Sequence, residues 1–293
     1  MCSINYDKKS INISDEQFQI LHDITIWQKP ASSHLLNYIY LVQNYVCFET
    51  TIFNSSLSFQ LRRNCYPEPF TQDLIKINLS IINFFSTAKA FIDKGISLTA
   101  KIDKTISFND KLSIEYDNKF SYRLLDKLRN FSQHNDNALD SLVYSQNTEN
   151  EKHKFNVTPK INTETLKNHK KFETKHILPD QGLDINLVFS IREYMECLSR
   201  AHSSAVSLIE KKMKDVFKIL KAYDIGIKKF ILKHDNTEVE IKIQINHLLE
   251  LNEQYKGLNF ISKSVADSFV TEEDIAKIKS LDQTWSSSEK KFI

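Results

Sequence analysis

Three residues near the end of one predicted helix have side chains suited to phosphate chemistry: Arg129, Asn130 and His134. A guanidinium group binds phosphate oxygens in pairs, and an imidazole exchanges protons near neutral pH. Asn130 and His134 are four residues apart and therefore lie one above the other on a helix. Arg129 lies about 140° around an ideal helix from His134. The two residues can meet on one ligand if the long Arg129 side chain reaches round the helix or if the helix loosens near Asn135. The pattern predicts a site for an anionic ligand such as a phosphate.

The segment that carries these residues has the apolar pattern of a packed helix. Phe120, Leu124, Leu128 and Phe131 recur at spacings of four, four and three. Such a stripe faces a core, while polar side chains cover the opposite face. We therefore expect a helix over about residues 112–133, with Arg129 and His134 off its packed face and free to be replaced without unfolding.

The stretch Arg129-Asn130-Phe-Ser-Gln-His134 resembles the signature of the HEPN superfamily. That signature has an arginine, a polar residue that is often asparagine, a short gap and a histidine near the end of a core helix. The stretch over residues 78–93 also looks like the preceding long helix of uncharacterised bacterial HEPN-like proteins. The resemblance covers about residues 34–145 well and residues 146–215 loosely.

The resemblance implies a metal-independent endoribonuclease, a toxin or antiphage effector, that needs no cofactor. Within it, His134 would transfer a proton, Arg129 would stabilise the crowded phosphorane, and Asn130 would orient its neighbours. Because one chain supplies a single copy of each, a two-fold homodimer would complete the site. RNA is the implied partner, together with a protein antitoxin or regulator. The residues expected to contact RNA around the catalytic group are Tyr122, Arg123, Lys127 and Gln133.

Two other functions stay open. One is a HEPN-like module without catalysis that binds a nucleotide, RNA or a partner protein, which the near-neutral net charge of +2 favours. The other is a helical scaffold in which Arg129 and His134 only cap a helix. If the Arg129 and His134 side chains point into a solvent cleft, the ribonuclease and the binding module both remain possible functions. If intramolecular salt bridges use them, the scaffold gains.

Composition limits the remaining classes. The chain has 293 residues, of which 41% are hydrophobic and 26% charged, the balance of a soluble globular protein. Only 4 Gly and 5 Pro favour long helices, and no glycine-rich phosphate loop exists. The four cysteines are scattered without zinc-ligand spacing, and no apolar run is long enough to span a membrane. We expect a cytoplasmic protein with no metal and no membrane partner.

The expected fold is mainly α: an up-and-down, HEPN-like helical bundle over residues 1–224, followed by a small α+β appendage over 225–293. An irregular insertion is expected at 145–182. In the appendage, alternating apolar residues predict a β-hairpin that turns at Asp235-Asn236. A last helix is expected to open at Thr271.

Long stripes with three- and four-residue spacing predict the helices of the bundle. A capping signature at Ser14 opens an earlier segment that Pro30 should end, and residues 102–111 should be a polar connection. The helices over 70–101 and 112–133 are expected to form part of the homodimer interface. The helical segments are residues 34–61, 70–101, 112–133 and 184–223.

Two polar residues lie within the apolar patterns. Glu49 interrupts the first long stripe, and we expect a solvated or paired carboxylate there rather than a catalytic one. His202 falls on the stripe over 184–223, where a hydrogen-bonded core histidine is the expected role rather than a ligand.

Overall fold

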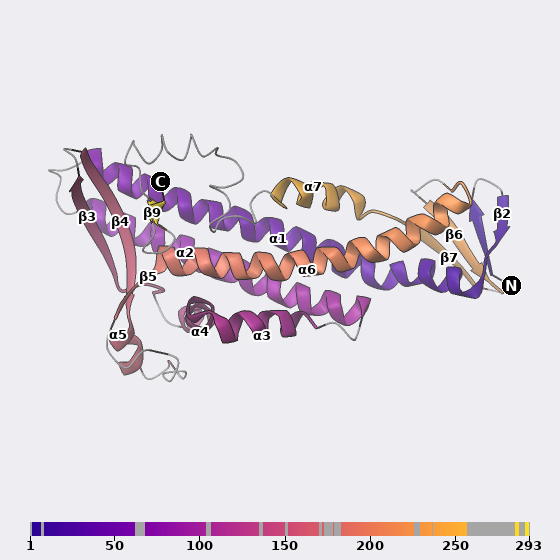
Figure 1. The fold of residues 1–293 in the computed structure, drawn as a ribbon, viewed down its shortest axis with the longest axis horizontal. Coiled ribbons are helices and arrows are strands. Elements are labelled where there is room, and N and C mark those ends of the chain that lie inside the picture. Colours follow the sequence, from indigo (N-terminus) through magenta and orange to yellow (C-terminus); the bar gives the residue numbers. More distant parts are fainter. Residues whose placement is uncertain are drawn as a thin grey trace. The chain divides into compact units, whose positions relative to one another are not determined.

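The computed structural model describes residues 2–6, 9–61, 68–103, 107–134, 137–149, 152–169, 172, 178, 183–225, 229–235, 237–256, 285–286 and 291–292. This part of the chain is mainly helical with some antiparallel sheet, which confirms the expected class (Figure 1). Its helices are α1 (Asp15–Leu61), α2 (Glu68–Ile102), α3 (Phe108–Asn118), α4 (Phe120–His134), α5 (Thr163–Asn168), α6 (Leu187–Ala222) and α7 (Asn246–Lys256). Its strands are β1 (Cys2–Tyr6), β2 (Lys9–Asn12), β3 (Ser141–Glu149), β4 (Lys152–Asn162), β5 (Asp184–Asn186), β6 (Lys229–His234), β7 (Thr237–Lys242), β8 (Trp285–Ser286) and β9 (Lys291–Phe292). The helix expected to open at Thr271 lies outside the described residues.

The chain folds as two compact units, and α1, α2 and α6 each contribute a segment to both. Unit 1 comprises residues 1–39, 90–111 and 201–256, and unit 2 comprises residues 40–89, 112–200 and 257–293. This division differs from the expected boundary at residue 224. The difference arises because β1, at the start of the chain, pairs with β6, which places the hairpin in unit 1 with the N-terminal residues.

Unit 1 contains a four-stranded antiparallel sheet in the order β2-β1-β6-β7. The expected hairpin is present as β6 and β7, and Asp235 at its turn has a left-handed backbone with φ of 49°. Ile4 lies opposite Leu232 across β1 and β6, and neither side chain is exposed. Because strand side chains alternate, one face of the sheet is part of the core of unit 1 and the other presents Ser3 and Asn5.

Helix α1 is longer than expected. It opens with a capping box, in which the Gln17 N–H donates to Ser14 Oγ and the Ser14 N–H donates to Gln17 Oε1. The expectation that Pro30 ends this helix is wrong, since Pro30 lies inside α1. Proline in a helix interior costs about 3 kcal/mol. Burial of Trp27 and Ala31, which flank it with at most 2% exposure, offsets that cost.

Helix α3 begins inside the segment expected to be a polar connection. Phe108 opens it, and its N–H donates to Thr99 Oγ1 of α2 at 3.3 Å. The Phe108 ring lies where a side chain on Gly95 would be, because a Cβ added there would come within 2.5 Å of the ring. The local sequence is polar, but this contact with α2 buries Phe108 and starts the helix early.

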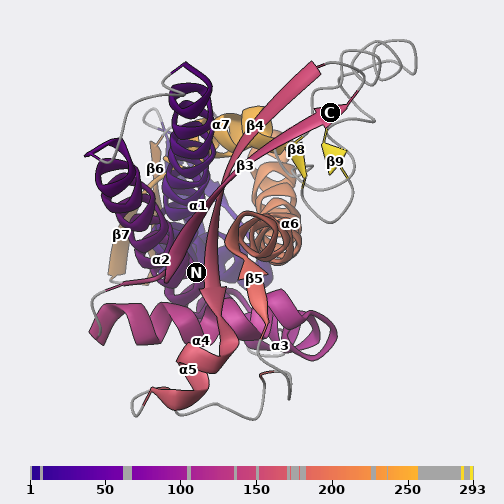
Figure 2. The same cartoon turned by 90° about the vertical axis from the view of Figure 1, so that its left-hand side faces the viewer.

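Unit 2 contains a long antiparallel hairpin where an irregular insertion was expected. Strands β3 and β4 pair from Ser141 opposite Lys160 to Glu149 opposite Lys152, and β5 extends the sheet (Figure 2). The hairpin is anchored to α1, where Ser56 Oγ accepts a hydrogen bond from the N–H of a β4 residue. Aromatic rings of Phe59 and Tyr144 also meet edge to face at 5.1 Å. Alternating residues over 154–159 predict a short strand, which lies within β4. The full hairpin was not predicted, because its partners on α1 are distant in sequence.

His202 is a core histidine, as expected. It is 4% exposed, its Nδ1 lies 3.2 Å from Nε2 of His34, and its ring stacks on Tyr38 at 3.5 Å. His34 is completely buried beside Phe91 in unit 1. Burial lowers the pKa of His34 from 6.5 to about 3, because the protonated ring would carry an unsolvated charge. Both histidines thus help to build the apolar core.

This burial makes the stability of the protein depend on pH. The folded state takes up the His34 proton only near pH 3, whereas the unfolded state takes it up near pH 6.5. The free energy of unfolding should therefore fall as the pH drops below 6.5, by up to about 5 kcal/mol at pH 3. His34→Gln should flatten this dependence in urea titrations between pH 7 and 5, whereas His247→Gln, at an exposed position, should not. Equal slopes for wild type and His34→Gln would contradict the assignment.

Candidate functional site

The candidate site is the second half of α4. The chain changes direction between α3 and α4, at Lys119 (Figures 1 and 2). At this break the Arg123 guanidinium donates to the carbonyl oxygens of Tyr116 and Asp117, at 2.8 and 2.9 Å. Carbonyls at a helix end lack intrahelical partners, so Arg123 caps α3. Arg123, expected to contact RNA, thus has a structural role within its own chain.

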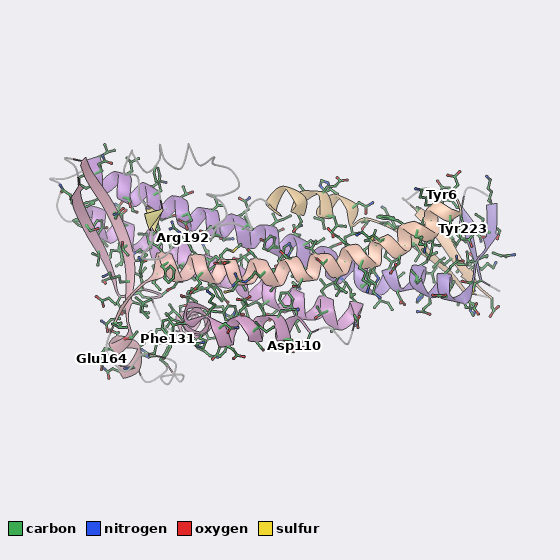
Figure 3. All side chains as sticks on the ribbon, viewed as in Figure 1. Tyr6, Asp110, Phe131, Glu164, Arg192 and Tyr223 are labelled. Carbon is green, nitrogen blue, oxygen red and sulfur yellow. The ribbon has the colours of Figure 1, made fainter. Side chains whose placement is uncertain are left out.

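The apolar stripe of α4 packs as expected. Leu124, Leu125 and Leu128 have no exposed surface. Phe131 lies near the end of the helix (Figure 3). Its ring meets the rings of His169 and Phe172 edge to face at 4.7 and 5.7 Å. The end of α4 is therefore held in unit 2 by residues that follow α5.

The segment after α4 is held by Asn78 of α2. Its Oδ1 accepts from the Ala138 N–H at 2.8 Å, and its Nδ2 donates to Asn137 Oδ1 at 3.2 Å. The amide is 9% exposed and uses both ends, as a buried amide must. The Asn78 contacts thus fix the chain direction directly after the predicted catalytic residues.

Arg129 lies in the interior of unit 2 rather than in a cleft. It is 5% exposed, and its Nη2 donates to Asp126 Oδ1 at 3.0 Å and to Asn130 Oδ1 at 3.4 Å. Its Nε and Nη1 are shielded from solvent and have no hydrogen-bond partner among the described residues. The fully buried Tyr194 of α6 is close enough for the Arg129 charge to oppose the rise in its pKa that burial causes.

The expectation that Arg129 lies off the packed face is wrong. The polar face of α4 is covered where Tyr122, 3% exposed, packs on Tyr194 at a ring distance of 4.9 Å. The pattern within α4 identifies its most apolar side but not a second side covered by α6. An intramolecular salt bridge at this position was expected to favour a structural role. The ion pair of Arg129 with Asp126 therefore favours such a role for this arginine.

The other predicted site residues are only partly brought together. Asn130 is exposed beside Arg129, and Lys127 Nζ lies 3.4 Å from Asp126 Oδ2 and 5.6 Å above the Tyr116 ring. Tyr122 is buried, and burial raises its pKa. Gln133 and His134 occupy the last turn of α4, but their side chains lie outside the described residues. The meeting of Arg129 with His134 thus stays a prediction.

Sequence reasoning missed two residues that control the site, Asp126 and Tyr194. A signal for Asp126 was present, because it precedes Arg129 by three residues, a spacing at which helical side chains meet. No comparable signal marked Tyr194, which lies on a distant helix.

Glu49 is a paired carboxylate, as expected. Arg192 of α6 donates through Nε and Nη2 to its two oxygens, each at 2.6 Å, and Tyr45 donates its hydroxyl to the same group. Arg192 is 5% exposed, and burial together with the Glu49 charge raises the pKa of Tyr45. The positive charge of Arg192 and the negative charge of Glu49 balance within this cluster, which marks it as a structural link between α1 and α6.

A polar groove of about 410 Å³ lies between α1 and α2 in unit 2, and the sequence did not indicate it. Its buried carboxylate, Asp73, accepts hydrogen bonds from Ser55 at 3.0 Å and from Tyr144 at 3.1 Å. Both oxygens are therefore satisfied from within the chain. The groove shows no group that requires a ligand.

Comparisons of the chain with protein-family models, with curated proteins and with solved structures give no match. The argument for a site therefore rests on the residues of this chain. In the described part, no three His, Cys, Asp or Glu side chains gather as metal ligands. None of the described helices combines the length and apolarity needed to cross a bilayer.

The buried ion pair leads to a stability prediction. Arg129→Ala should lower the free energy of unfolding by roughly 3 kcal/mol, because it removes the buried partner of Asp126 Oδ1 and leaves a cavity beside this carboxylate. Asn130→Ala, at the adjacent exposed position, should change it by less than about 0.5 kcal/mol. Urea unfolding followed by circular dichroism measures both. A loss of similar size in the two variants would show that Arg129 is not the buried member of the pair.

Proposed function

We propose that the chain is a metal-independent endoribonuclease of the HEPN type, a toxin or antiphage effector, with a composite site in a homodimer. The observation that carries this proposal is the position of Arg129, Asn130 and His134 in the last two turns of a single packed helix, α4. This is the position that the resemblance to the HEPN signature requires. An antitoxin or other protein regulator is part of the same proposal.

The chemistry needs only groups that these residues supply. The RNA 2′-oxygen attacks the adjacent phosphorus, the new P–O bond forms, and the bond from phosphorus to the 5′-oxygen breaks. His134 takes the 2′-hydroxyl proton, and the paired His134 of a second copy gives a proton to the leaving oxygen. Arg129 stabilises the charge on the phosphorane, and the exposed Asn130 orients the phosphate.

The structure sets a condition on this mechanism. Arg129 is held by Asp126 at 3.0 Å, so it must exchange that carboxylate for a phosphate before it acts. Both acceptors are anions, and the guanidinium keeps a charged partner throughout the exchange. The end of α4 must therefore open enough for RNA to reach a side chain that is 5% exposed.

The same burial favours a second candidate, a HEPN-like module that binds a partner without cleaving RNA. If the ion pair of Arg129 with Asp126 does not open, Arg129 only stabilises α4. The exposed Asn130 and the half-buried Lys127 would then be contact residues rather than catalytic ones.

Cleavage of fluorescent RNA in the presence of EDTA separates the two. The wild type should cleave, His134→Ala should be inactive, and Arg129→Ala should lose on the order of 10²–10³ in rate. His247→Gln, at an exposed histidine of α7, is the control and should keep its activity. Circular dichroism must show that each variant is folded, since Arg129→Ala is expected to be less stable. A wild type that never cleaves, or a fully active His134→Ala, would contradict the ribonuclease proposal and favour the binding module.

The homodimer has its own test. Ile75 and Leu79 of α2 lie one turn apart and are each 53% exposed, which supports a partner surface on this helix. Leu79→Glu should make the protein monomeric and inactive, because one chain then lacks half of the site. Multi-angle light scattering with Ile26→Glu, a substitution at an exposed residue of unit 1, provides the control. A wild type that stays monomeric at high concentration would contradict the composite site.

A further inference from the structure

The second half of α6, in unit 1, carries a row of lysines on its outer face. Four exposed lysines follow one another at spacings of three, four and three residues, and form what we call the lysine row: Lys211, Lys214, Lys218 and Lys221. On an ideal helix they lie within an arc of about 80° and extend over about 15 Å along the axis. The opposite face of this half is packed in the core, where four side chains are at most 2% exposed: Ile209, Met213, Val216 and Leu220. The packed helix therefore holds the lysine row in a straight line.

The first half of α6, in unit 2, uses its cations differently. Arg192 pairs with Glu49 at 2.6 Å, and Arg200 pairs with Glu115 at the same distance. Each guanidinium thus has a carboxylate partner from another helix of unit 2. The positive charges of this half link helices within the chain.

The lysine row has more positive charge than its own segment neutralises. Residues 210–221 contain five lysines and two acids, which gives a local net charge of +3, whereas the whole chain has +2. Of the two acids, Glu210 is half-buried and Asp215 is exposed beside the row. Within the described residues, neither acid forms an ion pair with a lysine of the row. The second half of α6 therefore presents a concentrated positive charge to the outside.

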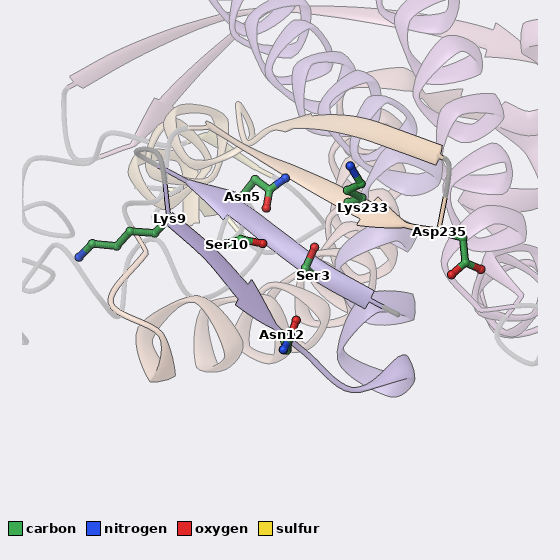
Figure 4. Close-up of a pocket in the computed structure, with 7 residues that line it drawn as sticks. All are labelled: Ser3, Asn5, Lys9, Ser10, Asn12, Lys233 and Asp235. Atoms are coloured by element: carbon green, nitrogen blue, oxygen red, sulfur yellow. The ribbon is translucent and has the colours of Figure 1, made fainter.

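The hairpin of the same unit shows how a balanced surface differs. Lys229 pairs with Glu240, and Lys233 pairs with Glu238 at 3.0 Å. Lys233 also borders the polar groove on the outer face of the sheet (Figure 4). Because its charge is already used within the hairpin, Lys233 does not give the groove the free positive charge that the lysine row has.

A straight row of ammonium groups fits a linear polyanion. A stacked nucleic acid strand carries a phosphate about every 3.4 Å, so the 15 Å of the row corresponds to about four or five phosphates. Lysine binds phosphate as a point charge, and contacts with the backbone carry no sequence information. A lipid surface fits less well, because an interfacial helix buries its apolar face in the membrane and that face of α6 lies in the core. We propose that the lysine row binds the phosphodiester backbone of a nucleic acid strand without reading its sequence.

This surface consists of residues of unit 1, whereas Arg129 and Asn130 belong to unit 2. It goes beyond the proposed ribonuclease, because backbone binding needs no catalytic residue. The two proposals therefore need separate measurements, and either one can fail while the other holds.

The test measures binding of the full-length protein to a fluorescent 2′-O-methyl oligouridine of 20 nucleotides by fluorescence anisotropy. This strand has no free 2′-hydroxyl, so attack by the 2′-oxygen cannot cleave it and binding is measured whether or not the chain is a ribonuclease. Each neutralised phosphate of a single strand contributes about −0.7 to the slope of log affinity against log salt, so four lysines predict a slope of about −3. Affinity should therefore fall about 50-fold between about 50 and 200 mM salt.

The double variant Lys214→Gln/Lys218→Gln should halve this slope, so that affinity falls only about sevenfold over the same range of salt. The matched control is Lys94→Gln/Lys101→Gln, which removes the same charge from two exposed lysines of α2 in unit 1. This control should keep the wild-type slope, because its lysines lie outside the row. Circular dichroism establishes that the variants are folded.

Lys211→Gln/Lys221→Gln provides a second test of the row and should also halve the slope. Polyglutamate of 20 residues should displace the labelled strand less well than unlabelled oligouridine does. Three outcomes would overturn the proposal: no binding at about 50 mM salt, wild-type slopes in both folded row variants, or equal displacement by polyglutamate. The last outcome would indicate an acidic protein as the partner of the lysine row.

Discussion

The buried ion pair between Glu49 and Arg192 is the contact on which the arrangement of unit 2 depends. Two hydrogen bonds of 2.6 Å hold the guanidinium in one plane, so they fix the rotation of α6 about its axis relative to α1. Residues two apart on a helix point to nearly opposite sides. With Arg192 turned toward α1, Tyr194 faces α4, where it packs on Tyr122 and lies near Arg129.

This packing links the stability of unit 2 to its proposed activity. Arg129 neutralises Asp126 in the interior, and its neighbours Tyr122 and Tyr194 exclude solvent. A phosphate reaches the guanidinium only if part of this cover moves. The contact that stabilises α4 therefore opposes an open catalytic site, and the two candidate functions differ in whether this contact opens.

Unit 1 shows a different use of burial. Its core includes the paired rings of His34 and His202, and burial lowers the pKa of His34 because the apolar surroundings disfavour a charge. Its sheet separates apolar from polar side chains by strand alternation, with Ile4 in the core and Ser3 and Asn5 on the outer face. The same alternation that completes the core thus also gives the sheet a polar outer face.

The sequence by itself determined the local structure wherever a repeating pattern was strong. The spacing of apolar residues predicted the helices over 34–61, 70–101 and 184–223, and alternation predicted the hairpin at Asp235, because the period of a pattern is a local property. It also predicted a solvated or paired carboxylate at Glu49 and a hydrogen-bonded core residue at His202, since buried polar groups need partners.

Only the tertiary structure decided which further surfaces are covered. Pro30 stays within α1 because packing offsets its cost, and the β1 pairing with β6 joins segments more than 200 residues apart. Arg129 is buried because α6 covers the polar face of α4, and the residue pattern of α4 does not predict this contact. Burial of a polar face depends on segments distant in the chain, so the sequence could list Arg129, Asn130 and His134 but could not show that Tyr194 packs near Arg129 or how accessible this arginine is.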